Sequence, residues 1–460
     1  MSQISHIKYK DVIEAWRFDA EYFKPKFLEM ISNLEKKWCF VLWENAKIRW
    51  WKRLPLWENF SDDWIPYIRA EDIKNWFVDY ENSPRISEDL HKILINYQTK
   101  KDDVLITIVW NSVWDVWFIK FDLDKCNLTE NACKIIDLNW INADSFFAFM
   151  LSEYWQNQIH REKVWTAQPK LALERIRRFK IPNINENVQQ KISEIIEIAY
   201  SKQKESKQLY QEAEDLLLAE LWLKEHVFTH TLTFSTTKKW VNEAWRYDAD
   251  YFQPKYDELI EKIENYKWGR EYLKELTTYI NNWNQPPYSE NWDIKFFSQK
   301  WIKDKWIDYS FLESAEEPMV ESSFFDEDKK KSSLVSKWDI LYYSVWANLW
   351  YCHTYLADEK IAVWSFINII RTDTSKFDSV AMWVILNSMI WRMQADRDKS
   401  WVAQPYIYAK NLRKFKIPLI NSQLQKEISD KIKESFKLRN ESKELLEQAK
   451  TMVEDEIEKE

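Results

Sequence analysis

Apolar residues follow a heptad pattern in two long segments of the chain, residues 185–225 and 421–460. In the first segment they recur at alternating steps of four and three, the spacing of a helix that buries one narrow stripe, and the second segment carries apolar residues from Leu424 to Met452. The stripe residues are Val188, Ile192, Ile195, Ala199, Leu209, Ala213 and Leu216 in the first segment, and Leu424, Ile428, Ile432, Leu445 and Met452 in the second. Neither helix has a partner of its own length within its half of the chain, so we predict that the two form an antiparallel coiled coil.

The segments before these helices favour short strands. Runs of β-prone residues at Asp103–Thr107 and Ile340–Tyr343 stand between turn signals, and a further strand is expected over Phe118–Phe121. Pro182 and Pro418 end the last strands just before the long helices begin. The mixture of long helices and short strands predicts an α+β chain.

The sequence contains an internal duplication. EAWRFDAEYFKPKF from Glu14 matches EAWRYDADYFQPKY from Glu243, 229 positions later. VWTAQPKLALERIRRFKIPNI from Val164 matches SWVAQPYIYAKNLRKFKIPLI from Ser400, 236 positions later, so the second copy carries a net insertion of seven residues. We therefore expect two copies of one plan, a lead-in helix, an α/β domain and a long spacer helix. The expected segments are 1–37, 38–184 and 185–225, then a linker with the second lead-in helix at 226–268, then 269–420 and 421–460.

Composition and charge are those of a globular protein. Of the 460 residues 45% are hydrophobic and 30% charged, and no apolar run is long enough to span a membrane. The N-terminal stretch lacks the apolar core of a secretory signal, and the four cysteines form no CxxC pair. We expect a cytoplasmic protein that does not bind membranes.

Glycine and tryptophan counts are abnormal. The chain has 1 Gly and 29 Trp, and Trp stands at apparent turns such as Asn75-Trp76 and before a strand at Trp338-Asp339. Turns that need a positive φ favour glycine, and tryptophan supplies it only with strain. Our hypothesis is that most of these tryptophans represent glycine, through UGA codons that the source organism decodes as glycine.

No catalytic constellation stands out. His226 and His230 lie four apart but lack the acid and the third ligand of a zinc site, and we interpret them as linker residues. The run from Trp110 to Trp117 lacks the Lys-Ser/Thr end of a phosphate-binding loop, and we expect a β-hairpin there. We expect no metal, cofactor or catalytic residue in this chain.

Basic clusters recur in the middle of both copies, although the net charge is −8. Such a charge argues against a free-standing, nonspecific nucleic-acid binder, and the acidic residues concentrate in the closing helices. Two DNA-facing surfaces are the favoured interpretation, in which Lys and Arg hold phosphates while Asn, Gln and Arg contact base edges. The candidate DNA-binding residues are Arg49, Lys52, Arg53, Arg69, Lys100, Lys101, Asn111, Ser112, Gln168, Lys170, Asn284, Gln285, Tyr288, Lys329, Lys330, Asn348, Gln404 and Tyr406. Gln168 and Gln404 fit a framework role equally well, because they repeat in both copies.

The duplicated plan resembles the specificity subunit of type I restriction–modification systems. The resemblance is carried by RFDAEYFKPKF and RYDADYFQPKY, by AQPKL…FKIPNI and AQPYI…FKIPLI, and by LLLAELWL before the linker, which becomes LLLAELGL with glycine restored. It covers nearly the whole chain, twice and in the same order. The tryptophans depart from the family pattern, which puts the printed loops in doubt but not the architecture.

The resemblance implies tandem α/β target recognition domains, each binding one half of a bipartite, asymmetric DNA sequence. The two spacer helices would set the distance between half-sites and dock two methyltransferase (modification) subunits, and a restriction/translocase subunit would join them. S-adenosylmethionine and ATP would act in those partners. A helix of about 36 residues is roughly 54 Å long, which corresponds to about 16 base pairs of duplex DNA.

Two other interpretations remain open at this stage. A self-contained DNA methyltransferase or nuclease would use the Asn284-Gln285-Pro286-Pro287-Tyr288 segment, which partly matches the (N/D/S)PP(Y/F) motif of amino-methyltransferases. A coiled-coil scaffold without a DNA role would leave the divergent basic middles without a purpose.

Overall fold

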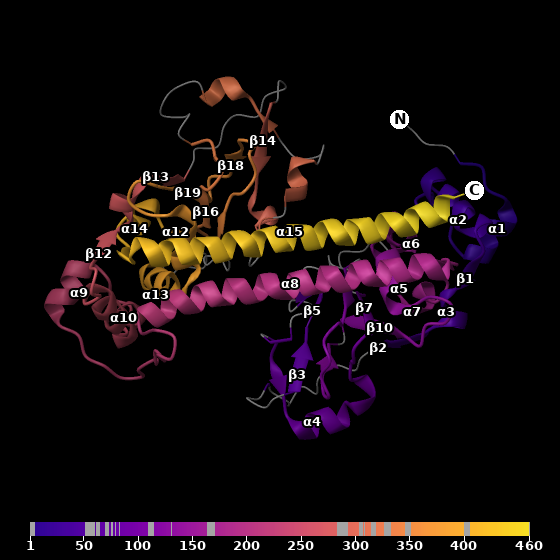
Figure 1. Ribbon diagram of the computed structural model, residues 1–460, viewed down its shortest axis with the longest axis horizontal. Helices are drawn as coiled ribbons and strands as arrows, with labels where there is room; N and C mark the ends of the chain where they lie inside the picture. The colour runs from indigo at the N-terminus through magenta and orange to yellow at the C-terminus, as the bar shows by residue number, and fades with distance from the viewer. Residues whose placement is uncertain are drawn as a thin grey trace. The chain divides into compact units, whose positions relative to one another are not determined.

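A computed structural model describes residues 5–459, except 51–59, 61–64, 70–72, 75–76, 79, 82, 109–114, 130, 163–170, 283–292, 303–306, 308, 314–318, 326–332, 346–350 and 400–404 (Figure 1). The chain divides into two compact units. Unit 1 comprises residues 1–205 and 438–460, and unit 2 comprises residues 206–437. The long helices α8 (Glu186–Glu220) and α15 (Ser422–Glu458) therefore each contribute one half to each unit.

Unit 1 is built on a mixed sheet of strand order β2-β10-β7-β8-β5-β4. Its strands are β2 (Lys47–Trp50), β4 (Ile73–Lys74), β5 (Phe77–Val78), β7 (Val104–Thr107), β8 (Val116–Phe118) and β10 (Ala132–Ile136). Smaller sheets pair β6 (Arg85–Ile86), β3 (Ile65–Ile68) and β9 (Asn127–Leu128), and β1 (Cys39–Val41) with β11 (Lys180–Pro182). The helices besides α8 and α15 are α1 (Tyr9–Ala15), α2 (Pro25–Lys36), α3 (Leu42–Asn45), α4 (Glu88–Ile93), α5 (Ala143–Leu151), α6 (Glu153–Glu162) and α7 (Leu173–Ile176).

Unit 2 repeats this plan. Its central sheet has the order β13 (Thr277–Asn282), β19 (Ile367–Thr372), β16 (Ile340–Tyr343), β17 (Cys352–Thr354). Smaller sheets join β15 (Met319–Val320), β14 (Ile294–Phe297) and β18 (Ala362–Val363), and β12 (Arg270–Tyr272) with β20 (Lys416–Pro418). The helices are α9 (Lys238–Ala244), α10 (Pro254–Glu264), α12 (Ser379–Asn387), α13 (Met389–Asp398) and α14 (Ala409–Leu412).

The same two framework contacts recur in both units. In unit 1 the Gln158 side chain accepts a hydrogen bond from the Lys180 backbone N–H (2.7 Å) and donates one to its carbonyl (3.0 Å). In unit 2 Gln394 makes the same two bonds to Lys416, at 2.8 and 3.0 Å. Each glutamine amide thus satisfies the backbone of a short strand, β11 or β20, that leads into a long helix.

Small residues recur every seven positions where α8 and α15 meet: Ala199, Ser206 and Ala213 on α8, and Ser435, Ser442 and Ala449 on α15. In unit 1 the Ser442 hydroxyl donates to the Ala199 carbonyl (2.8 Å). In unit 2 the hydroxyls of Ser206 and Ser435 each donate to the carbonyl of the other residue, at 2.8 and 2.7 Å. In each unit the helices run antiparallel, and their backbones approach closely because no large side chain separates them.

Most residues with an unusual positive φ are tryptophans. In the described part of the chain, six of the eight non-glycine residues with positive φ are Trp16, Trp38, Trp140, Trp222, Trp245 and Trp338. The left-handed conformation disfavours bulky side chains, and glycine adopts it freely. The only glycine of the chain, Gly269, has φ 78°.

The end of α8 shows what these positions require. Leu223 N–H bonds the Leu218 carbonyl (2.7 Å) and Trp222 N–H bonds the Ala219 carbonyl (3.0 Å), which is the Schellman arrangement with Trp222 at the position that glycine usually occupies. The Trp222 side chain is 67% exposed. By contrast Trp155 is fully buried and packs edge-on against Phe179 at 5.0 Å. The turn positions therefore suit glycine, whereas Trp155 fills the core.

Two of the three strands expected from the sequence lie where the pattern predicts them. The strands expected at 103–107 and 340–343 are β7 and β16, and β7 pairs with β8 as expected for a hairpin. The strand expected at Phe118–Phe121 was placed wrongly, because β8 ends at Phe118, which pairs with Val104, the first residue of β7. The long helices were expected as separate segments, but the compact units divide both of them. In the described part of the chain, no helix is long and apolar enough to cross a membrane.

Replacing Ser206 with leucine is expected to destabilise the protein by about 1–3 kcal/mol, since the larger side chain has no room between the helices. Chemical denaturation would measure the change in the free energy of unfolding. Gln208→Leu, at an exposed position two residues away, is the matched control and should have little effect. Equal effects of the two substitutions would contradict close packing at Ser206.

Replacing Trp222 with glycine is expected to stabilise the protein by about 1–2 kcal/mol, because the left-handed conformation is then unstrained. Trp155→Gly is the control and should destabilise by several kcal/mol, because it opens a cavity in the core. A Trp222→Gly variant less stable than the parent in thermal unfolding would refute the glycine-like character of this turn.

Candidate nucleic-acid interface

A basic hollow of about 490 Å³ lies on unit 1 beside the edge strand β2. Lys47 and Arg49 line it from β2, where the strand alternation places both on one side while Ile48 between them is buried. Arg177 and Arg178 line it from the turn after α7. Four cations thus converge from two segments that are far apart in the sequence.

Only part of this charge is neutralised nearby. Arg177 pairs with Glu174 (2.8 Å), and Lys47 pairs with Asp137 (2.8 Å), whose pKa it lowers by a side-chain hydrogen bond. Arg49 and Arg178 are exposed and form no ion pair with another described residue. Because anions satisfy guanidinium groups best, the hollow is suited to a phosphate of a nucleic-acid backbone.

Unit 2 carries a related pair of cations, Arg413 and Lys414, after α14. The Arg413 guanidinium donates to the Ile280 carbonyl of the edge strand β13 at 2.6 Å. The ammonium group of Lys410 lies 5.3 Å from the Tyr408 ring. The two units thus place basic residues beside equivalent edge strands but with different neighbours.

The structure describes five of the DNA-binding candidates. Arg49 lies in the basic hollow, Lys100 and Lys101 are exposed before β7, and Arg69 is half-buried after β3. Tyr406 is half-buried, stacks against Tyr408 with ring centroids 4.5 Å apart, and burial raises its pKa. The candidates Lys52, Arg53, Asn111, Ser112, Gln168, Lys170, Asn284, Gln285, Tyr288, Lys329, Lys330, Asn348 and Gln404 lie outside the described residues.

Sequence reasoning left Lys47, Arg177 and Arg178 off the candidate list. Arg177 and Arg178 follow the repeated AQP segment in the sequence, and no sequence pattern connects them to β2. The available signal was the alternation Lys47-Ile48-Arg49, which is typical of a strand with one polar face.

Two ion pairs, each with a buried aspartate, stabilise the central sheets. In unit 1 the Lys134 ammonium lies 3.0 Å from the Asp103 carboxylate, and burial raises the pKa of Asp103. In unit 2 Arg371 binds Asp339 through two hydrogen bonds of 2.8 and 2.6 Å. Asp103 and Asp339 occupy equivalent positions in the repeat. Both units therefore keep the aspartate, but its partner is a lysine in unit 1 and an arginine in unit 2.

The predicted stripe residues lie on the packed faces of the long helices. In unit 1, Ile192 and Ala199 are buried in one core with Ala449, and in unit 2 Ala213 shares a core with Ile428 and Ile432. Val188, Ile195, Leu445 and Met452 pack partly buried against the unit 1 core, Leu216 and Leu424 against the unit 2 core, and Leu209 is half-buried. The neighbours Ile196, Leu217, Leu446 and Val453 are buried more deeply, so the packed face is wider than the predicted stripe.

In the part of the chain that the structure describes, no group of three or more His, Cys, Asp or Glu residues could hold a metal ion. His226 Nε2 lies 2.6 Å from a Glu258 oxygen, and His230 Nε2 lies 3.8 Å from an Asp250 oxygen. The Pro286-Pro287-Tyr288 segment of the methyltransferase interpretation lies outside the described residues.

One segment of the chain matches a known protein family. Residues 49–215, from within β2 to near the end of α8, match the family model of the type I restriction modification DNA specificity domain. A comparison with curated proteins finds no match.

Among solved structures, the type I restriction-modification S subunit from M. genitalium is 11% identical over 91% of this chain and 94% of that one, with a TM-score of 0.41. The HsdS subunit from Thermoanaerobacter tengcongensis is 14% identical over 91% and 96%, with a TM-score of 0.28. The type IIG restriction endonuclease BpuSI is 12% identical over 38% of this chain and 28% of that one, with a TM-score of 0.30. With TM-scores this low, the assignment rests on the matched segment and not on the superpositions.

The matched segment begins at Arg49, within β2, and contains Arg177 and Arg178 of the basic hollow. By this match, residues 49–215 form a type I restriction modification DNA specificity domain.

Proposed function

We propose that each unit recognises one half of a bipartite, asymmetric DNA target. One observation carries the proposal: the two units share the same internal hydrogen bonds, but the basic residues on their surfaces have different neighbours. Gln158 and Gln394 make the same bonds to equivalent strands, whereas the cations beside β2 and β13 have different neighbours. Two domains that share a framework but not a surface suit two half-sites of different sequence.

In this proposal the basic hollow of unit 1 holds the DNA backbone. Arg49 and Arg178 bind phosphate, because each is exposed and lacks an acidic partner among the described residues. Base edges are contacted by the polar candidates of the loops, such as Asn111 and Gln168 in the first copy. Phosphate contacts give affinity and position, and the loops give sequence preference.

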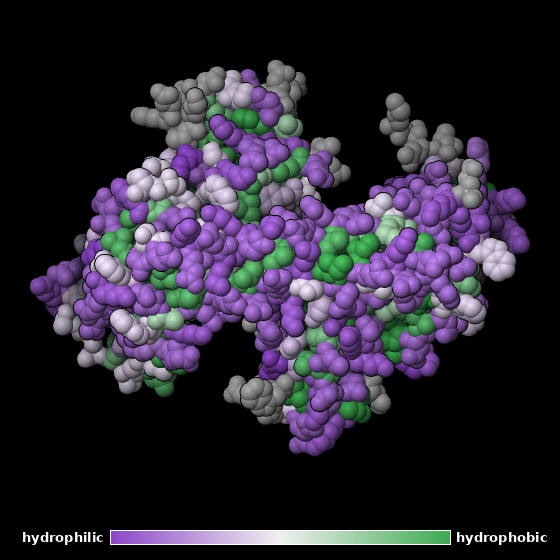
Figure 2. All heavy atoms as spheres, in the orientation of Figure 1, coloured by the Kyte–Doolittle hydropathy of each residue, from purple (hydrophilic) through white to green (hydrophobic). Residues whose placement is uncertain are grey.

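The pair of long helices acts as the spacer and as the docking surface for two methyltransferase subunits. Hydrophilic side chains cover much of the visible face of the molecule, with hydrophobic patches between them (Figure 2). A restriction/translocase subunit completes the complex.

Methylation and cleavage belong to the partners in this proposal, and this chain is not itself an enzyme. S-adenosylmethionine and ATP bind to the methyltransferase and restriction subunits. The complex acts on double-stranded DNA in the cytoplasm.

Replacing Arg49 and Arg178 with glutamine is expected to weaken DNA binding by the complex for every sequence alike. The dependence of affinity on salt should also become shallower, because each guanidinium that binds a phosphate displaces about one counterion. Fluorescence anisotropy over a salt series would measure both effects. Lys36→Gln, an exposed cation on α2, is the control, and an unchanged salt slope in the double variant would count against the hollow.

Single-molecule sequencing of native DNA, read for methylated adenines, tests the whole proposal. A split, asymmetric motif that disappears when the gene is disrupted is the expected result. Deleting seven residues from both α8 and α15 should shorten the unread spacer by about three base pairs, since each residue contributes about 1.5 Å. A continuous motif would favour a self-contained enzyme, and an unchanged spacer in the deletion variant would refute the spacer role.

A further inference from the structure

Unit 2 contains a second hollow, of about 540 Å³, where the first turns of α15 pass the start of α12. Lys376 lines it from the loop before α12, and Lys426 and Lys433 line it from α15. Neither α15 lysine forms an ion pair with another described residue, although the Lys433 ammonium lies 5.6 Å from the Trp338 ring. Lys376 lies 3.3 Å from Asp373.

The helix ends add to this positive potential. Ser379, the first residue of α12, and Ser422, the first residue of α15, both line the hollow. The helix dipole gives the start of a helix partial positive charge, which favours anions. Side chains already cap both starts: Asp378 accepts from the first N–H groups of α12, and Asn421 accepts from Leu424 N–H in α15. Two carboxylates also line the hollow, that of Asp378 in this cap and that of Asp430, which is exposed.

A buried hydroxyl in the wall points independently to a ligand. Ser429 is only 1% exposed, and its Oγ has no hydrogen-bond partner among the described residues. Buried polar groups normally form a hydrogen bond. A buried hydroxyl without one in the wall of a hollow therefore indicates that a bound ligand supplies its partner.

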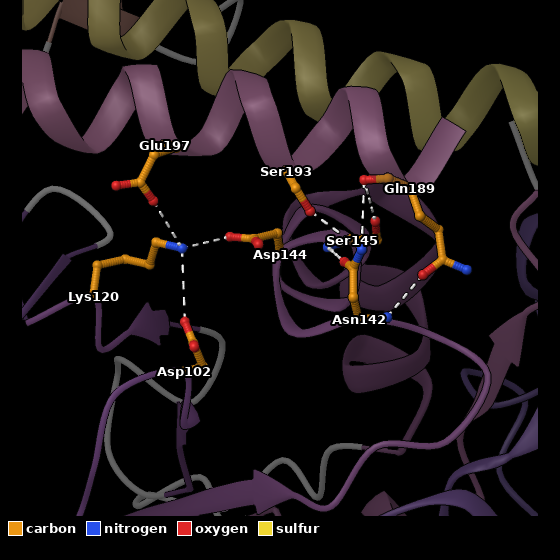
Figure 3. A network of polar contacts seen from close by, with 8 residues as sticks. All are labelled: Asp102, Lys120, Asn142, Asp144, Ser145, Gln189, Ser193 and Glu197. Atoms are coloured by element: carbon orange, nitrogen blue, oxygen red, sulfur yellow. Dashed lines mark hydrogen bonds and ion pairs between the residues drawn. The ribbon is translucent and has the colours of Figure 1, made fainter. Parts of the chain in front are cut away.

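The equivalent place in unit 1 is filled by the chain itself (Figure 3). The buried Lys120 ammonium lies 2.9 Å from Asp144, 3.2 Å from Glu197 and 3.6 Å from Asp102. Ser193, the equivalent of Ser429, accepts a hydrogen bond of 3.2 Å from Asn142. In unit 1 the junction between helix and domain is thus an internal cation enclosed by carboxylates.

All four members of that ion cluster are replaced in the second copy. At an offset of 236, Leu356 stands for Lys120, Trp338 for Asp102, Val380 for Asp144 and Lys433 for Glu197. An apolar residue thus takes the place of the internal cation, and one carboxylate on the long helix becomes an ammonium group. The sign of the charge at this junction therefore reverses between the two units.

We propose that this hollow of unit 2 binds a phosphate group. Lysine ammonium groups and a serine hydroxyl are donors, and the two helix dipoles favour negative charge, which together suit a tetrahedral oxyanion. The phosphate belongs either to a small free ligand or to a DNA backbone. Because the Lys120 ion cluster occupies the equivalent place in unit 1, only the hollow of unit 2 binds a phosphate group.

The test uses the full-length chain and inorganic phosphate at constant ionic strength, with chloride as the replaced anion. Thermal unfolding and titration calorimetry should show a saturable rise in Tm, because a ligand that binds only the folded state stabilises it. Lys426→Gln with Lys433→Gln should weaken phosphate binding by at least about tenfold, since two charge-assisted hydrogen bonds are removed. Lys437→Gln with Lys443→Gln, on the same helix and outside the hollow, makes the same change in charge and should leave binding intact.

Ser429→Ala separates a binding role from a structural one. If the Ser429 hydroxyl binds phosphate, the alanine variant should keep the Tm of the parent in phosphate-free buffer. Its Tm should then rise less than that of the parent when phosphate is added. Competition by a short DNA duplex would identify the DNA backbone as the source, and its absence would identify a free ligand.

A phosphate response that does not saturate, or that the Lys426/Lys433 variant retains in full, would overturn the proposal. The result is independent of the proposed function, because target binding by the complex is measured separately.

Discussion

Close packing between α8 and α15 is the constraint on which both units depend. Small residues at every seventh position, such as Ala199 and Ser206 on α8 and Ser435 and Ser442 on α15, bring hydroxyls of one helix within reach of carbonyls of the other. The same helices then enter the hydrophobic core of each unit. Each unit is thereby fixed to the two long helices through its own core, not through a flexible linker.

The repeated elements could be predicted from the sequence because local signals and duplication agree there. The runs that became β7 and β16, and Pro182 and Pro418 at the ends of β11 and β20, stand where two copies of one pattern confirm each other. The end of β8 could not be predicted, because it depends on the register with β7. Likewise Leu217, not Leu216, is the more deeply buried, since the helix packs against a domain as well as another helix.

The candidate interface was predicted less completely than the fold. Arg49 was found from its basic cluster, but its convergence with Arg177 and Arg178 depends on tertiary contacts between β2 and the turn after α7. The tryptophans are a different case, since composition alone marked them as abnormal. Their positive φ values, at Trp16, Trp222 and Trp245 for example, place several at the helix-end positions that glycine favours. The codon hypothesis remains a prediction, and the backbone geometry shows where it matters most.

The path of the chain has a consequence for biosynthesis. Unit 1 includes residues 438–460, and Leu446, Ala449, Val453 and Ile457 lie in the same core as the strands near the N-terminus. A growing chain folds from its N-terminus, yet this core lacks part of its apolar surface until α15 has left the ribosome. A product interrupted after β20 would therefore leave its first domain with exposed apolar surface, open to proteolysis. The arrangement couples the synthesis of α15 to the stability of unit 1.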